Sequence, residues 1–186
     1  MEWLIVLGVV VLLLLWLVVI YNRLVALRQT CGQSWADIEV QLKLRHDLIP
    51  NLVETVKGYA AHERGTLEEV IRARNAAVSA SGPAAASAAE GQLGAALGRL
   101  FALSEAYPDL KANANFMALQ GELSTIETKI AAARRFFNNA VSEFNTAIQS
   151  IPAVFFAGAM GFTPRSFFEL DSEERAAVKT APQVKF

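Results

Sequence analysis

The chain has 186 residues, of which 53% are hydrophobic and only 19% are charged. Its 17 Lys and Arg against 18 Asp and Glu give a formal net charge of −1, so no overall field attracts it to nucleic acid. A single cysteine excludes an internal disulfide framework and a metal cluster held by cysteines alone. With a mean hydropathy of +0.31, the composition predicts one domain with a membrane-embedded part.

Trp3–Ile20 is an apolar run without a charged side chain. As a helix it spans about 27 Å, close to the roughly 30 Å hydrocarbon core of a bilayer. Trp3 and Trp16 near its ends, and Tyr21 after it, suit the headgroup level. A cleaved signal peptide would need a basic start and small residues at a cleavage site, and neither is found here. We therefore expect a retained transmembrane anchor over residues 1–21.

Basic residues flank this span on one side. Arg23 and Arg28 follow it, whereas the acidic Glu2 precedes it. Because basic flanks stay in the cytoplasm, the sequence predicts a single-pass protein with a short outside N-terminus and a cytoplasmic remainder. Residues 23–186 carry no net formal charge, so contact with lipid or with other chains should depend on apolar, shape-matched surfaces.

The next segment continues the anchor as a helix. From Leu24 to Tyr59 apolar residues recur at every third or fourth position, with Arg45 at one position of this stripe. Pro50 interrupts the stripe, and because proline removes a backbone hydrogen bond, the helix either kinks or turns back in a hairpin there. The stripe keeps its phase across Pro50, which favours the kink.

Two further helices follow. Ser79–Pro83 predicts a turn, with Pro83 suited to the first turn of the next helix, over about Ala84–Ala106. Tyr107-Pro108 should end that helix. From Leu119 to Ile148 apolar residues form a coiled-coil-like seam, and Pro152 should stop this last helix.

No segment shows the sustained alternation of a strand, so the predicted class is all-α. We expect an antiparallel up-and-down bundle of about four long helices, kinked near Pro50. The anchor over residues 1–21 would be followed by a cytoplasmic bundle over 22–151 and a phenylalanine-rich C-terminal tail over 152–186.

Long motifs cover nearly the whole chain: Tyr21–Arg28, Trp35–Lys43, Arg45–Ala60, Glu105–Asn113, Gln120–Asn138 and Pro182–Phe186. They resemble the LemA family of bacterial membrane proteins. The chain departs from the family pattern at Cys31-Gly32 and at Thr128. The resemblance implies one span of the bacterial cytoplasmic (inner) membrane and a cytoplasmic helical bundle. The family has no established biochemical activity, but its magnetosome-associated members are implicated in forming or organising an internal membrane.

The sequence lacks the motifs of common catalytic sites, including P-loops, dinucleotide fingerprints, zinc spacings and nucleophile elbows. Neither His46 nor His62 has the glutamate three residues earlier that a di-metal bundle site requires. We expect both to be surface or helix-end polar groups, and Cys31, on the apolar stripe, to be a small buried hydrophobe. These observations predict no catalytic, cofactor or metal site, no small-molecule substrate, and therefore no enzyme.

A polar group on the last helix is a candidate interface between identical chains: Arg134, Arg135, Asn138 and Asn139. The alternative is a hydrogen-bonded polar layer inside the bundle.

The tail is a second candidate contact surface, because five phenylalanines would make a poor exposed loop: Phe155, Phe156, Phe162, Phe167 and Phe168. It either caps the end of the bundle, docks on the membrane surface, or meets a neighbouring subunit.

Together these features predict a non-enzymatic membrane protein whose bundle forms a homo-oligomeric scaffold and organises or remodels the lipid bilayer. The alternative is a membrane-anchored adaptor that recruits a protease or signalling partner.

Overall fold

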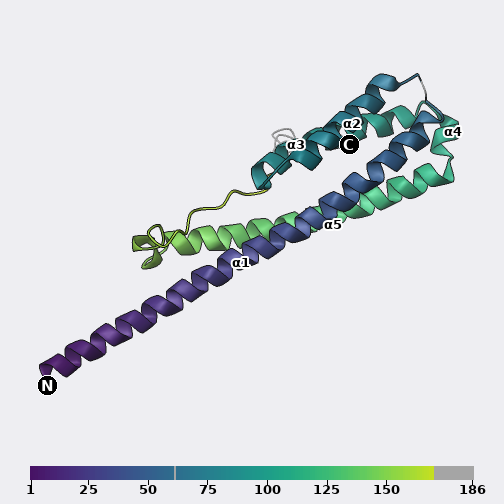
Figure 1. The fold of residues 1–186 in the computed structure, drawn as a ribbon. Coiled ribbons are helices and arrows are strands. Elements are labelled where there is room, and N and C mark those ends of the chain that lie inside the picture. Colours follow the sequence, from purple (N-terminus) through teal and green to yellow (C-terminus); the bar gives the residue numbers. More distant parts are fainter. Residues whose placement is uncertain (61, 170–186) are drawn as a thin grey trace, which may run out of the picture. The chain divides into compact units, whose positions relative to one another are not determined.

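A computed structural model describes residues 1–60 and 62–169 (Figure 1). The elements are α1 (Glu2–Lys57), α2 (Arg64–Ser79), α3 (Pro83–Ser104), the short α4 (Pro108–Lys111), α5 (Ala114–Gln149) and one 3-10 turn, η1 (Ala153–Phe155). These described residues contain no β-strand, which confirms the all-α class. The predicted tail is described as far as Glu169, so the closing motif at Pro182–Phe186 lies outside the described residues.

The chain divides into two compact units. The anchor unit contains Met1–Ala36 and Arg135–Ser166, and the bundle unit contains Asp37–Arg134 together with the described residues from Phe167 on. Helices α1 and α5 each contribute residues to both units.

The bundle unit has a continuous apolar core drawn from α1, α2, α3, α4 and α5. Helices α2 and α3 run antiparallel beside each other (Figure 1). The turn between them contains Gly82 at φ 81°, a left-handed conformation that favours glycine, and Pro83 is the first residue of α3. The predicted turn at Ser79–Pro83 is thus confirmed.

Helix α1 continues through Pro50 to Lys57, so the chain does not turn back at this proline. Because Pro50 has no N–H, the carbonyl of His46, four residues earlier, loses its helical partner. The Nε–H of Arg74 on α2 donates to this carbonyl at 3.2 Å. A side chain of the neighbouring helix therefore supplies the hydrogen bond that the proline removes.

The end of α1 differs from the sequence expectation. The apolar stripe extends to Tyr59, yet α1 ends at Lys57 and Tyr59 is 44% exposed. Its hydroxyl accepts a hydrogen bond from Nδ2 of Asn113 at 2.9 Å. Tyr59 thus belongs to the connection between helices rather than to the core.

In the anchor unit, the second half of α5 packs against the part of α1 that follows the apolar run. The rings of Trp35 and Phe137 have centroids 5.4 Å apart, and Phe144 and Ile148 of the predicted seam are buried. Helix α5 ends at Gln149, before Pro152, as predicted.

Candidate functional site

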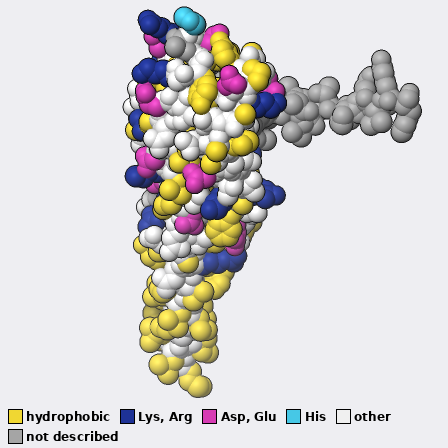
Figure 2. All heavy atoms as spheres, turned by 90° about the vertical axis from the view of Figure 1, so that its right-hand side faces the viewer, with side chains coloured by type: hydrophobic (Ala, Val, Ile, Leu, Met, Phe, Trp, Pro, Cys, Tyr) yellow, Lys and Arg dark blue, Asp and Glu magenta, His cyan; other side chains and the backbone are white. Residues whose placement is uncertain are grey.

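The first feature with functional meaning is the apolar surface at the start of α1. This is the one helix among the described residues with a segment long and apolar enough to cross a membrane, judged by length and composition, and none of that segment is buried. Trp3 is 86% exposed, Trp16 49% and Tyr21 41%, and Arg23 is also exposed. Figure 2 shows this end of the chain covered by hydrophobic side chains on the face in view.

The tail returns to the residues that follow this apolar run. Phe162 is buried, with its ring centroid 5.6 Å from that of Tyr21 and 6.4 Å from that of Phe144. The guanidinium carbon of Arg28 lies 5.1 Å from the Phe162 centroid, a cation–π contact. Phe162 therefore fixes the tail against α1 and α5 at this end of the anchor unit.

The other four phenylalanines proposed as contact residues have different surroundings. In the anchor unit, Phe155 is 79% exposed and Phe156 is half-buried. In the bundle unit, Phe167 is 37% exposed, whereas Phe168 is buried. Three of the five phenylalanines thus belong to the anchor unit and two to the bundle unit.

The candidate polar interface on α5 is also divided. Arg135 and Asn139 are exposed and Asn138 is half-buried in the anchor unit. Arg134 is half-buried and lines a pocket of the bundle unit.

Cys31 is fully buried, in agreement with its prediction as a small hydrophobe. Burial raises the pKa of its thiol above the ordinary 9.0, although the nearby Arg165 works against that increase. A thiol that stays protonated is a poor nucleophile and a poor metal ligand.

Sequence reasoning missed a buried ionic cluster in the bundle unit. His46 was expected at the surface or at a helix end, but it is only 7% exposed, and that expectation is wrong; His62 is exposed as expected. Nε2 of His46 lies 2.6 Å from Oε1 of Glu90, and Nη1 of Arg45 donates to Oε2 of Glu90 at 3.0 Å. Both oxygens of a buried carboxylate on α3 are thus engaged by neighbouring side chains of α1.

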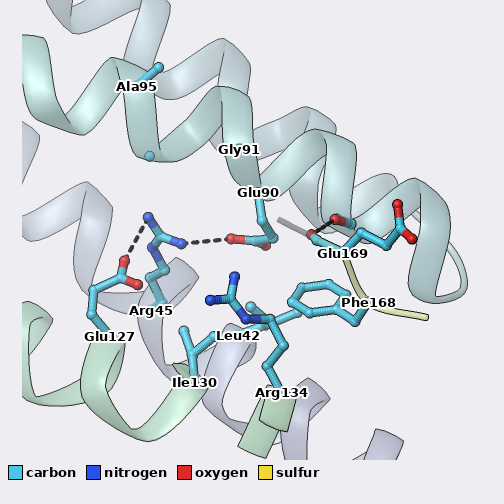
Figure 3. A pocket seen from close by; sticks show the side chains of 12 residues that line it. Leu42, Arg45, Glu90, Gly91, Ala95, Glu127, Ile130, Arg134, Phe168 and Glu169 are labelled. Carbon is cyan, nitrogen blue, oxygen red and sulfur yellow. Dashed lines mark hydrogen bonds and ion pairs between the residues drawn. The ribbon is translucent and has the colours of Figure 1, made fainter. Parts of the chain in front are cut away.

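Arg45 also reaches α5. Its Nη2 is 2.7 Å from Oε1 of Glu127, so the guanidinium lies between two carboxylates (Figure 3). The Nε of Arg45 is buried without a hydrogen-bond partner. These groups line a pocket of about 380 Å³, whose wall on α3 includes the small residues Ser87, Gly91 and Gly94.

The cluster is suited to holding helices together. An ionised carboxylate only accepts hydrogen bonds, so the Nε2 of His46 that faces Glu90 carries the hydrogen. Arg45 and Glu90 are only 5% and 7% exposed. Each would be a buried, uncompensated charge without the other, so the pair must stay together. Among residues 1–60 and 62–169, no group of three or more His, Cys, Asp or Glu side chains is placed to hold a metal ion.

Part of this cluster had a sequence signal. Arg45 occupies a position of the apolar stripe, where a charged residue implies a buried partner. Glu90 lies in a stretch of alanine, glycine and serine, where no apolar periodicity indicates which face is buried.

Known proteins resemble this chain along most of its length. Magnetosome protein MamQ of Magnetospirillum gryphiswaldense is 26% identical over 174 residues, covering 80% of this chain and 64% of MamQ. Magnetosome proteins MamQ 1 and MamQ 2 of Paramagnetospirillum magneticum are each 26% identical over 175 residues, with the same coverage. This chain thus spans about 64% of the length of these curated relatives. The sequence profile of the LemA family matches residues 34–186, and the chain belongs to the LemA family.

Proposed function

We propose that this chain is a non-enzymatic, membrane-anchored scaffold that assembles with itself and thereby organises or remodels a bacterial inner membrane. The observation that carries the proposal is the bare apolar surface of residues 3–20, which belongs to the same helix as Cys31 and Trp35 of the folded anchor unit. An exposed apolar surface of this length is unfavourable in water and favourable in a bilayer.

The relatives support the membrane part of this proposal, because each is called a magnetosome protein. The basic flank supports the orientation. Arg23 and Arg28 follow the apolar run, which favours a short outside N-terminus and a cytoplasmic bundle.

Self-assembly is supported by apolar side chains left exposed on the helices of the bundle unit. On α1, Val40 is 56% exposed and Leu44 is 46% exposed, and residues four apart share a helical face. On α2, Ile71 and Val78 are 44% and 53% exposed, seven residues apart on one face. Contact with another apolar surface would remove these side chains from water, which is favourable, and a second copy of the chain presents an identical apolar face.

The test is the subunit number of the full chain in mild detergent and in nanodiscs, measured by light scattering and crosslinking. We expect a homo-oligomer that Leu44→Glu weakens, whereas Gln92→Glu at an exposed position of α3 leaves it intact. A monomer under all conditions would exclude the scaffold. Capture of one stoichiometric foreign partner without self-crosslinks would favour the adaptor instead.

A further inference from the structure

We infer that residues 151–160, here called the interfacial loop, form a second lipid-binding element, which enters the leaflet where the apolar run of α1 ends. The inference rests on the proposed membrane anchoring and adds a defined contact to it. The occupant of this surface is the lipid at the boundary between headgroups and acyl chains.

The sequence around the interfacial loop lacks charge. Between Glu143 and Arg165 the chain has no Asp, Glu, Lys, Arg or His. A connection in water ordinarily contains polar and charged side chains, because its backbone and surface are solvated. An uncharged loop avoids the large cost of bringing an ionised group to the lipid boundary.

The loop has an outer face that is strongly apolar. Ile151 is 78% exposed, Val154 46%, Phe155 79% and Met160 41%. On the inner side, Ala153 and Ala157 are buried, as is Phe162 just beyond the loop. Four large apolar side chains of the loop are thus exposed while Ala153 and Ala157 are covered, the reverse of what burial in water favours.

Contacts within the anchor unit place this loop beside the end of the apolar run. Phe162 packs edge-on against Tyr21, the residue directly after that run. A pocket of about 300 Å³ is lined by Ile20 and Arg23 from α1 and by Ile151 and Pro152 from the loop. If residues 3–20 span the bilayer, the loop must lie at the level of its boundary.

Lipid is favoured over a second copy of the chain because the loop adjoins Ile20 and Arg23, at the end of an apolar helical segment of which none is buried. Amphipathic elements at the interface reach about 5–10 Å into the boundary between headgroups and acyl chains, a depth within reach of large side chains such as Phe155. Arg23 lines the same pocket as Ile151, and Arg28 contacts Phe162 just beyond the loop, so both would lie near headgroup phosphates. The loop would add apolar volume to one leaflet only.

The experiment uses the full chain with Cys31→Ala, reconstituted at one copy per nanodisc of phosphatidylethanolamine and phosphatidylglycerol. An environment-sensitive fluorophore is attached separately at Phe155→Cys, Leu12→Cys and Ser142→Cys. Leu12 reports the anchor, and Ser142 is a matched exposed position on α5 of the same unit. Each probe is challenged with brominated lipid and with aqueous iodide.

We expect the probe at 155 to emit at a shorter wavelength than the probe at 142, to lose most of its emission to brominated lipid, and to resist iodide. Quenching of the 155 probe by iodide would overturn the inference, as would protection from both quenchers, which indicates a protein contact. If the probe at 12 also escapes brominated lipid, the anchoring itself fails. If the probe at 155 escapes it while the probe at 12 is quenched, anchoring stands and the lipid contact of the interfacial loop does not.

Discussion

Arg74 donates its Nε–H to the main-chain carbonyl of His46, the acceptor that Pro50 deprives of its helical partner. A proline inside a helix ordinarily costs about 3 kcal/mol or more, in part because this carbonyl is left unpaired. Here α2 supplies a charged donor, and hydrogen bonds from charged groups are stronger than those from neutral ones. The continuity of α1 through Pro50 is therefore supported by a residue of another helix.

This relationship predicts that Arg74 and Pro50 are energetically coupled. Arg74→Met should lower the free energy of unfolding by about 1–3 kcal/mol, because it leaves the His46 carbonyl without a partner. In a Pro50→Ala background the alanine N–H can pair with that carbonyl, so the same change should cost less. Denaturant unfolding of the four chains in mild detergent, followed by circular dichroism, measures the coupling. Equal costs in both backgrounds would show that Arg74 does not compensate for the proline.

The buried ionic cluster predicts unequal effects for its two carboxylates. Glu90→Gln should destabilise the bundle by about 3–5 kcal/mol, because it removes the buried negative charge that pairs with Arg45. Glu127→Gln should cost about 1 kcal/mol or less, because the Glu127 side chain is 48% exposed. The thermal unfolding midpoints of both variants and of the unchanged chain, measured in the same detergent and buffer, test this difference.

A double variant separates pairing from packing. Arg45→Met combined with Glu90→Leu should regain much of the stability that Glu90→Gln loses, because no uncompensated charge remains at these two positions. If the double variant loses as much free energy of unfolding as Arg45→Met and Glu90→Leu lose when measured singly and added together, an ion pair is not the cause of the destabilisation.

In the anchor unit, Phe162 and Phe155 allow a comparison of the same substitution at a buried and at an exposed position. Phe162→Ala should destabilise this unit by about 3–5 kcal/mol, since it empties the site between Tyr21 and Phe144. Phe155→Ala should change stability by less than about 0.5 kcal/mol, because Phe155 is 79% exposed. Amide hydrogen exchange at residues 157–166 measures the loss of local stability. We expect faster exchange for Phe162→Ala and no change for Phe155→Ala.

The buried thiol of Cys31 should make the free energy of unfolding depend on pH. Burial raises its pKa in the folded chain, so above the ordinary value of 9.0 the unfolded chain releases a proton that the folded chain retains. The free energy of unfolding should therefore fall as pH rises through about 9, and Cys31→Ala should remove this part of the slope. At neutral pH, iodoacetamide should modify Cys31 far more slowly in the folded chain than in denaturant.

The long helices α1, α3 and α5 could be predicted from the sequence because their signals are local, whereas the short α4 could not. Apolar spacing defined the stripe of α1 and the seam of α5, and Gly82-Pro83 marked the turn between α2 and α3. The end of α1 had no such signal. Tyr59 continues the apolar spacing, yet it is 44% exposed and its hydroxyl accepts a hydrogen bond from Asn113, a residue 54 positions later.

The buried cluster was beyond sequence reasoning for a related reason. Arg45 and Glu90 are 45 residues apart, and pairing them requires knowing which face of α3 meets α1. In its alanine-rich surroundings Glu90 has no feature in the sequence that distinguishes it from an ordinary solvent-exposed charged residue. Likewise, the five tail phenylalanines share one segment in sequence, but their separation into two units depends on packing.

Glu90 has a further consequence for an alanine-rich helix. Alanine, glycine and serine side chains in the first half of α3 differ little in shape, so the contacts of that half alone would change little if the helix slid by one turn. Such a slide moves Glu90 by about 5.4 Å, strands its buried charge and leaves Arg45 with Glu127 as its one carboxylate partner in the cluster. One carboxylate thereby selects the axial position in the half of α3 that lacks large apolar side chains, whereas Leu93, Leu97 and Leu100 select it in the other half.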